Sequence, residues 1–390
     1  MQHNAKYISN LTPLRGIAAL LVAIFHFEMA VARFVPAQTT MFFEKSYLMV
    51  DLFFIISGFI MLHVYGNSFK TSVSKKSFRQ FIVARFARIY PLHFFSLLLL
   101  IFIVFLLLPP PDNQARLIEA RSAIPFNFLL LHAFYTTTIF TWNIPSWSIS
   151  PEWWTYLLFP LMALFINRKK FPAIIFFLIF IIVSYYSIMY LLPRKNPLYP
   201  SVPVPHNINT TYDYGFLRGL SGFMCGMIVY AAYQSGWVKK LFGKDLISIL
   251  LLLLIIIVLH FAMNDIIAVI LFALLVLSFA CNETTIHRIC NNKVLQYIGD
   301  ISYSIYLMQI FFQVPFSHGF RLPGVTGVGR GKLNIDFGGG LMYCCIYVIL
   351  LIIVSSLSYY LIEKPGRKYI NRKWGNASFT NEGDRVPAIR

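Results

Sequence analysis

The sequence predicts an all-α integral membrane protein, a polytopic bundle of about ten transmembrane helices with both termini in the cytoplasm. Of its 390 residues, 58% are hydrophobic and only 12% are charged, whereas soluble domains are typically about 25% charged. Apolar stretches recur along the whole chain, and about twenty apolar residues cross a bilayer as a helix. Composition therefore indicates one membrane domain over residues 1–370 and a short polar cytoplasmic tail, 371–390, with no second catalytic domain.

The formal net charge of +18 does not indicate nucleic-acid binding, because the charges lie between apolar stretches. Basic residues without any acidic residue occur in the connection 66–88 and in the turn 168–170, and more follow the last apolar stretch. This distribution obeys the rule that positive residues stay on the cytoplasmic side. We therefore expect the lipid bilayer, and no nucleic acid, as a partner.

Each apolar stretch predicts one helix. Arg15 interrupts the first stretch, which then continues through His26, so we expect a retained helix rather than a cleaved signal peptide. The even number of helices keeps every basic connection on one side of the membrane. The predicted ranges are 11–31, 47–65, 89–108, 152–167, 171–192, 214–234, 246–262, 266–281, 297–316 and 340–362.

One apolar segment, 124–141, is predicted not to span the membrane. His132 and the threonines of 136–138 weaken its apolar character, and counting it as a span would place the basic turn 168–170 outside. The loops 193–212 and 317–339 are then extracytoplasmic. The five cysteines show neither a disulfide framework nor zinc-ligand spacing, so no metal is expected.

Two polar residues of the first helix share one face. Arg15 and His26 are eleven residues apart, which is almost three turns and roughly 16 Å of depth. Arg15 then lies near the cytoplasmic surface and His26 in the outer half of the membrane. The simpler interpretation is an arginine that reaches the headgroups and a hydrogen-bonded core histidine.

The second helix opens with Asp51 at a depth similar to that of His26. An aspartate at the bilayer centre costs about 2.5–3.5 kcal/mol on insertion scales, so we expect a partner, and His26 is one candidate. The alternative is an interfacial aspartate in water. Gly58 lies two turns later on about the same face and predicts the close approach of another helix.

Arg85 and Arg88 are three residues apart, on one face at the predicted cytoplasmic start of the third helix. Basic residues gather there for topological reasons alone. Paired arginines also bind phosphate bidentately, so the pair suits the phosphates of a nucleotide-containing cofactor.

Ser150, followed by a proline, predicts the start of the fourth helix, with Glu152 in its first turn. The helix dipole favours a carboxylate there, which explains the residue without any catalysis. The same placement puts Glu152 at the outer face, level with His26 and Asp51. Arg218, early in a later helix, reaches the same layer. A histidine, two carboxylates and an arginine at one depth indicate a polar site.

Six short motifs follow one another across residues 11–366. They are Leu14-Arg15-Gly16 with His26, Asp51-Leu-Phe-Phe-Ile-Ile-Ser57-Gly58, Arg85-Phe-Ala-Arg88, Trp147-Ser148-Ile-Ser-Pro-Glu152, Gly299-Asp-Ile-Ser302-Tyr303-Ser-Ile-Tyr306-Leu307 and Glu363-Lys364-Pro365. In this order they resemble the acyltransferase-3 family of integral-membrane O-acyltransferases. One position departs from the family pattern, because Gln309 stands where Tyr-Leu-X-His carries histidine.

The resemblance implies that an acyl group, usually acetyl, moves from cytoplasmic acyl-CoA to a hydroxyl of an extracytoplasmic glycan. The acceptor would be a surface polysaccharide or lipopolysaccharide, and the protein would lie in the inner membrane. Acetyl-CoA would be the donor substrate, with its phosphates held by Arg85, Arg88 and Arg15.

In the same scheme His26 would act as general base on the acceptor hydroxyl, or alternatively carry a transient acyl group. Glu152 or Asp51 would orient His26 and stabilise its imidazolium form. Arg218 would stabilise the developing oxyanion. Two further residues of the matching motifs, Ser57 and Ser148, would support the site.

Two other function classes fit parts of the sequence. A secondary transporter that exports a sugar or polymer would use the buried charges as a substrate pathway, but the internal symmetry common in transporters is not visible. The arginine pair would also have no role in it. A non-catalytic membrane partner would explain the topology but not the polar layer. The enzyme is therefore favoured.

Overall fold

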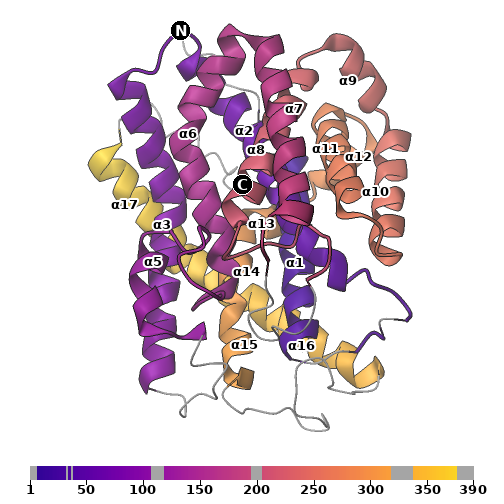
Figure 1. Cartoon of the computed structure of the whole chain (residues 1–390). Coiled ribbons are helices and arrows are strands. Elements are labelled where there is room, and N and C mark those ends of the chain that lie inside the picture. The colour runs from indigo at the N-terminus through magenta and orange to yellow at the C-terminus, as the bar shows by residue number, and fades with distance from the viewer. Residues whose placement is uncertain are drawn as a thin grey trace.

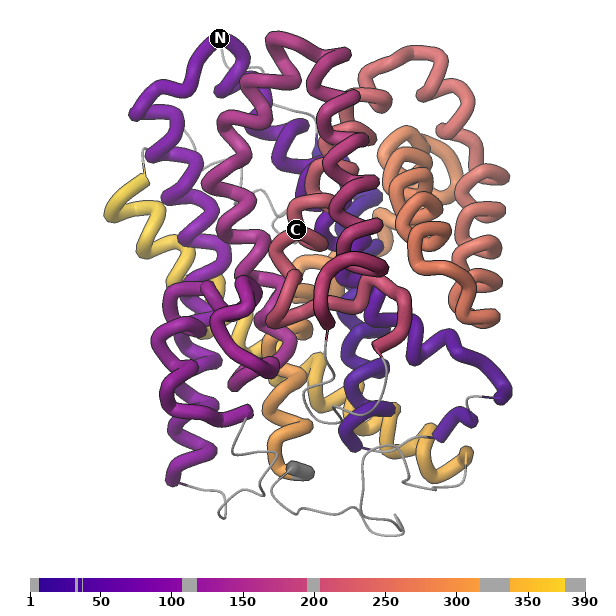
Figure 2. Tube along the Cα trace, viewed as in Figure 1, coloured from indigo at the N-terminus to yellow at the C-terminus, as the bar shows by residue number. Residues whose placement is uncertain are grey.

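The computed structural model describes residues 7–31, 34–36, 38–106, 118–194, 204–317 and 337–375. These residues form helices and connecting turns, with no strand among them. Most helices run along a common direction as an elongated bundle (Figure 1). Two of them, α10, Asp245–His260, and α11, Asp265–Cys281, pack together at one edge of the bundle (Figure 2).

Seven helical stretches in the described part of the chain are long and apolar enough to cross a membrane. Several contain a 3-10 or π segment beside the α-helix. They are α1, Leu11–Ala30; Glu44–Phe69 with α2, Met49–Tyr65; α3, Lys75–Leu106; Ile144–Arg168 with α6, Ile149–Arg168; Lys170–Leu191 with α7, Lys170–Tyr186; α8, Gly215–Tyr233; and Phe337–Trp374 with α16, Phe337–Ser358, and α17, Lys364–Trp374.

The remaining predicted spans are helical but not simple. A short helix, α9, Gly236–Phe242, meets α10 at a bend of 67°, and the two together make an eighth candidate span. The apolar helix α11 has 17 residues. The stretch predicted as 297–316 is divided into α13, Lys293–Asp300, α14, Ser302–Met308, and α15, Ile310–Ser317. The prediction of an all-helical, multi-spanning protein is confirmed, with seven or eight clear candidate spans in place of ten.

Helix α3 shows why a hydropathy pattern alone misplaces a boundary, whereas segment 124–141 agrees with its prediction. Helix α3 begins at Lys75 rather than near residue 89, because its first four turns are basic and amphipathic rather than apolar. The segment 124–141 contains only the five-residue helix α5, Ile124–Phe128, followed by turns. His132 is buried there and bonds through Nε2 to the Ser146 hydroxyl at 3.1 Å. The segment is therefore partly buried and forms no spanning helix, as predicted.

Helices α2 and α8 pack closely enough that only glycine fits at their crossing. A Cβ atom at Gly58 would overlap the backbone carbonyl of Phe223, and one at Gly226 would overlap the carbonyl of Ile55. The close approach predicted at Gly58 is confirmed, and the partner helix is α8.

The connections that the charge rule placed together lie at one end of the bundle. Arg168 donates to the carbonyl of Thr71, which joins the turn after α6 to the connection before α3. Lys170 donates to the carbonyl of Ala231 near the end of α8, at 3.3 Å. At the opposite end, Lys45 forms an ion pair with Asp265 at 2.6 Å. The connections that follow α2, α6 and α8 therefore lie together, at the opposite end from the start of α2.

Candidate active site

A cavity of about 170 Å³ lies among α1, α2, α3, α6 and α14, and it collects most of the predicted site residues. Helix α2 contributes mainly apolar side chains to its lining, whereas α3, α6 and α14 contribute most of its charged groups and hydroxyls. Predicted residues outside this lining are His26, Asp51 and Arg218. Those inside it are Arg15, Ser57, Arg85, Arg88, Ser148 and Glu152.

Two of the three cavity arginines have no carboxylate partner among the described residues. Arg15 donates only to the Ser302 hydroxyl, at 3.3 Å. Arg85 donates to the Tyr65 hydroxyl at 2.6 Å, and its guanidinium lies 4.9 Å from the centre of the Tyr65 ring. The Arg85 Nε atom is buried without a hydrogen-bond partner. These two cations are only partly exposed, so an anionic ligand would compensate them.

The third arginine is compensated. Arg88 forms an ion pair with Glu363, which also accepts a hydrogen bond from the Ser304 hydroxyl at 2.8 Å. Glu363 is almost completely buried, and the Arg88 guanidinium lies 5.4 Å from the centre of the Tyr303 ring. The two arginines of the predicted phosphate fork therefore differ, because Arg88 is tied to the C-terminal helix and Arg85 is not.

Glu152 faces the arginine cavity. Its Oε1 atom accepts hydrogen bonds from the Tyr156 hydroxyl and, at 3.3 Å, from the Ser57 hydroxyl. Tyr156 follows Glu152 by one helical turn, so the same face of α6 supplies both groups. Glu152 has no hydrogen bond to His26, and the expected orientation of His26 by Glu152 is therefore not found.

Asp51 has a different partner from the one that the sequence suggested. Its two carboxylate oxygens accept from Nε and Nη2 of Arg218 at 3.0 and 2.7 Å, and both side chains are completely buried. Arg218 also donates to the carbonyls of Thr210 and Tyr47, each at 3.2 Å. The partner expected for a buried aspartate exists, but it is Arg218 and not His26. The interfacial, hydrated aspartate is excluded.

His26 contacts Gln309, the residue that departs from the family motif. The distance from Nδ1 of His26 to Oε1 of Gln309 is 3.1 Å. Gln309 is completely buried, and its amide nitrogen donates to the carbonyl of Tyr306 at 2.8 Å. Tyr306 lines the arginine cavity, where its hydroxyl accepts from the Ser148 hydroxyl at 2.8 Å. Ser148, Tyr306 and Gln309 thus connect the cavity with His26.

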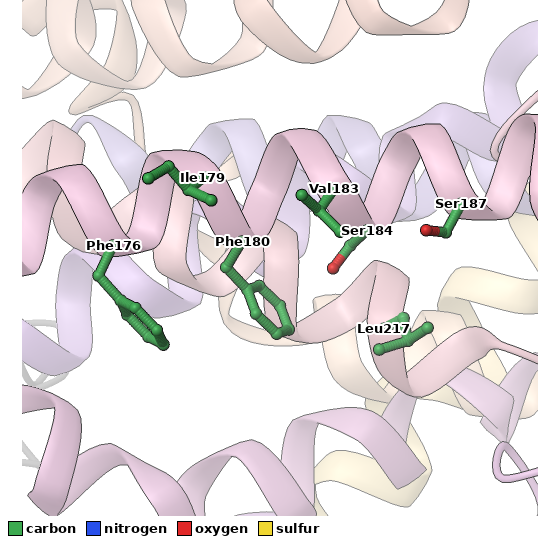
Figure 3. A pocket seen from close by; sticks show the side chains of 7 residues that line it. All are labelled: Phe176, Ile179, Phe180, Val183, Ser184, Ser187 and Leu217. Carbon is green, nitrogen blue, oxygen red and sulfur yellow. The ribbon is translucent and has the colours of Figure 1, made fainter.

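A second hollow, of about 360 Å³, lies along α7 next to Leu217 of α8 (Figure 3). Its lining consists of aromatic and aliphatic side chains with two serine hydroxyls, Ser184 and Ser187, and contains no charged group. Phe176, Ile179 and Val183 are exposed on the outer surface of this helix, as lipid contact requires. We therefore place the candidate chemistry at the arginine cavity.

Sequence reasoning missed two tyrosines, Tyr156 of the cavity lining and Tyr65, which bonds to Arg85. Tyr65 and Tyr156 contact the charged groups, yet tyrosine is too common in this chain to attract notice. Tyr156 carried one usable signal, its spacing of one turn from Glu152 on the same helix face. Gln309 was noticed only as a departure from a motif, and its contact with His26 joins residues 283 positions apart.

Comparison with known proteins shows the family of the chain. The model of the acyltransferase domain family matches residues 8–361, which is most of the chain. The chain belongs to the acyltransferase-3 family. The acyltransferase is 38% identical to "Protein 2 in picA locus" of Rhizobium radiobacter over 148 residues, covering 36% of this chain and 71% of that protein.

A second relative covers nearly the whole chain. It is the "Putative acetyltransferase ORF330" of Acidianus two-tailed virus, 23% identical over 347 residues, which are 85% of this chain and 88% of the viral protein. No solved structure matches the chain. Family and fold together make this protein a multi-pass membrane acyltransferase.

Proposed function

We propose that the acyltransferase moves an acetyl group from cytoplasmic acetyl-CoA to a hydroxyl of an extracytoplasmic glycan, a surface polysaccharide or lipopolysaccharide. The observation that carries the proposal is the pair Arg15 and Arg85, which line a partly buried cavity without a carboxylate partner in the described part of the chain. The name of the viral relative supports acetyl as the group transferred.

The donor side of the proposal rests on charge. A desolvated cation without a counter-ion is unfavourable, and phosphate is the anion that the planar guanidinium group binds best. Arg85 and Arg15 would bind the phosphates of CoA. Arg88 is held by Glu363 and would contribute with its remaining N–H groups. The thioester arm would then extend along the cavity toward Ser148 and Tyr306.

In the proposed chemical step, His26 takes one proton from the acceptor and later returns it. The oxygen of the acceptor hydroxyl attacks the thioester carbonyl carbon while the imidazole of His26 takes the hydroxyl proton. The tetrahedral intermediate collapses, the carbon–sulfur bond breaks, and the thiolate leaves with the proton returned by His26. An acetyl-histidine intermediate is the alternative use of the same atom. Both require a neutral ring.

The other predicted residues receive supporting roles. Glu152, which accepts hydrogen bonds from Ser57 and Tyr156, would hold these two hydroxyls in position. Asp51 and Arg218 would clamp α2 to α8 and to the connection before α8. This role replaces the oxyanion-binding role expected for Arg218, because its guanidinium is already occupied.

We further propose that the protein lies in the cytoplasmic membrane with both termini inside. An even number of crossings is required for this, and α9 with α10, α11, and α13 to α15 would add three crossings to the seven long stretches and make ten. The basic connections 66–88 and 168–170, and the basic residues after the last span, would then all face the cytoplasm.

The proposal is tested with detergent-purified protein, radiolabelled acetyl-CoA and a glycan fraction extracted from the host envelope. His26→Ala should reduce label transfer to the glycan by about 10²- to 10⁴-fold, the usual contribution of a general base. Affinity for acetyl-CoA should change less than about twofold, since His26 does not line the arginine cavity. Transferred label should be released by mild base, as an O-ester requires.

A matched control is His260→Ala, because His260 bonds to Thr40 at one end of α10, away from the cavity. It should retain wild-type transfer. Wild-type turnover by monodisperse His26→Ala protein would contradict the mechanism. Label transfer to a lipid or protein in place of the glycan would contradict the proposed acceptor.

A further inference from the structure

We propose that Gln309 is a positioning residue for acyl transfer: its side-chain carbonyl holds His26 in the neutral tautomer that carries its proton on Nδ1. The atom left with a lone pair is then Nε2, which would accept the proton of the acceptor hydroxyl. This inference rests on the proposed function, because it assumes that His26 is the base.

The orientation of the Gln309 amide follows from its two contacts. The Nε2 atom of Gln309 donates to the carbonyl of Tyr306 at 2.8 Å, which a carbonyl oxygen in that position could not do. The Oε1 atom therefore points the other way, to Nδ1 of His26 at 3.1 Å. An amide oxygen only accepts hydrogen bonds, so Nδ1 must be the donor.

Burial stabilises this orientation of the Gln309 amide. Gln309 is completely buried at the junction of α14 and α15, where a rotated amide would lose both hydrogen bonds without water to replace them. Tyr306 makes both connections, because its backbone carbonyl fixes the Gln309 amide and its hydroxyl accepts the hydrogen bond from Ser148. The cavity and the base are thus held by one short helix, α14.

The choice of an amide has a chemical consequence. A carboxylate on Nδ1 would also fix the tautomer, but its charge would favour imidazolium and raise the pKa of the histidine. The neutral amide fixes the tautomer without adding charge. His26 then remains unprotonated at physiological pH, which both general-base and nucleophilic use of Nε2 require.

The test compares three substitutions at Gln309 with a matched control one turn later. Gln309→Leu removes the acceptor and should lower kcat by about 10- to 100-fold with the KM for acetyl-CoA within about twofold. Gln309→His restores a ring nitrogen that can accept, and should recover part of the lost kcat. Gln313→Leu alters another buried glutamine, on α15, and should leave kcat unchanged.

The pH profile separates positioning from mere packing. Activity of a base rises with pH through its pKa, so Gln309→Glu, which raises that pKa, should move the acidic limb of kcat/KM upward by about one pH unit. A residue that only fills space would leave the midpoint unmoved. An unshifted midpoint in Gln309→Glu overturns the inference, even if Gln309→Leu does not fold.

A failure of the positioning role can be distinguished from a failure of the proposed function. If His26→Ala is inactive but monodisperse Gln309→Leu has wild-type kcat, the positioning role is wrong and the proposed function stands. If His26→Ala is itself active, the proposed base is wrong and the role of Gln309 falls with it.

Discussion

At the scale of single residues, Arg85 and Arg88 of one motif differ in what they contribute: Arg88 stabilises the fold, and Arg85 is available to a ligand. Arg88 has a buried carboxylate partner, so its loss would leave Glu363 uncompensated and destabilise the protein. Within the described ranges, the acceptors of Arg85 are a tyrosine hydroxyl and a methionine sulfur. Its removal strands no charge, and the protein should fold normally without it.

Arg85→Ala should therefore weaken CoA binding rather than folding. A hydrogen bond between charged groups contributes about 1.5–3 kcal/mol, so the Kd for CoA should rise about 10- to 100-fold. Arg85→Lys should rescue only part of this, because an ammonium lacks the planar fork. Titration calorimetry on purified protein measures the change, and pantetheine, which lacks the nucleotide phosphates, should bind both proteins alike.

The exposed Arg121, which lies over the ring of Phe105 near the end of α3 and does not line the cavity, offers a control of equal charge. Arg121→Ala should bind CoA as the wild type does. An unchanged Kd in Arg85→Ala would show that the arginine serves topology alone.

At the scale of elements, the crossing of α2 and α8 holds the site in shape. Asp51 and Arg218 lie on these two helices, and the helices can approach only because Gly58 and Gly226 lack side chains. Helix α2 also carries Ser57 of the cavity. Separating the two helices would therefore disturb the clamp and the cavity together.

Gly58→Leu should lower the melting temperature in detergent and reduce the yield of monodisperse protein, because its side chain would meet the backbone of Phe223. Gly236→Ala is the matched control, since a Cβ there meets nothing within 4 Å at the start of α9. We expect it to be neutral or slightly stabilising. A wild-type melting temperature for Gly58→Leu would mean that α2 and α8 do not cross so closely.

At the scale of the whole molecule, the alternation of helix direction determines which side of the membrane the arginine cavity faces. Three long helices, α3, α6 and α7, separate Ser72 from Asn209, so these exposed residues should lie on opposite sides of the membrane. In a background with the five native cysteines replaced, Ser72→Cys should react with a membrane-impermeant maleimide only from the cytoplasm.

Asn209→Cys should react only from outside. Labelling of both positions from one side would contradict the alternation and add a crossing, for which segment 124–141 is the candidate. It would also contradict the proposal that the arginine cavity binds acetyl-CoA from the cytoplasm.

The helical class, most helix positions and the motif residues were predictable from sequence, because hydrophobicity, charge bias and short-range spacing are local properties. Local pattern failed where a helix is interrupted, as at the junctions between α13, α14 and α15, or where its first turns are polar, as at Lys75. Residues 376–390, most of the predicted tail, lie outside the described part of the chain.

Only the tertiary structure decided which polar groups meet. Asp51 pairs with Arg218 across 167 positions, and His26 pairs with Gln309 across 283. Depth along a helix, which the sequence determines, narrows the candidates for each partner. The rotation and tilt of one helix against another choose among them, and those depend on close contacts such as Gly58 against α8 rather than on any period in the sequence. The sequence thus determined a membrane acyltransferase and its charged residues, and the packing decided which of them form the cavity.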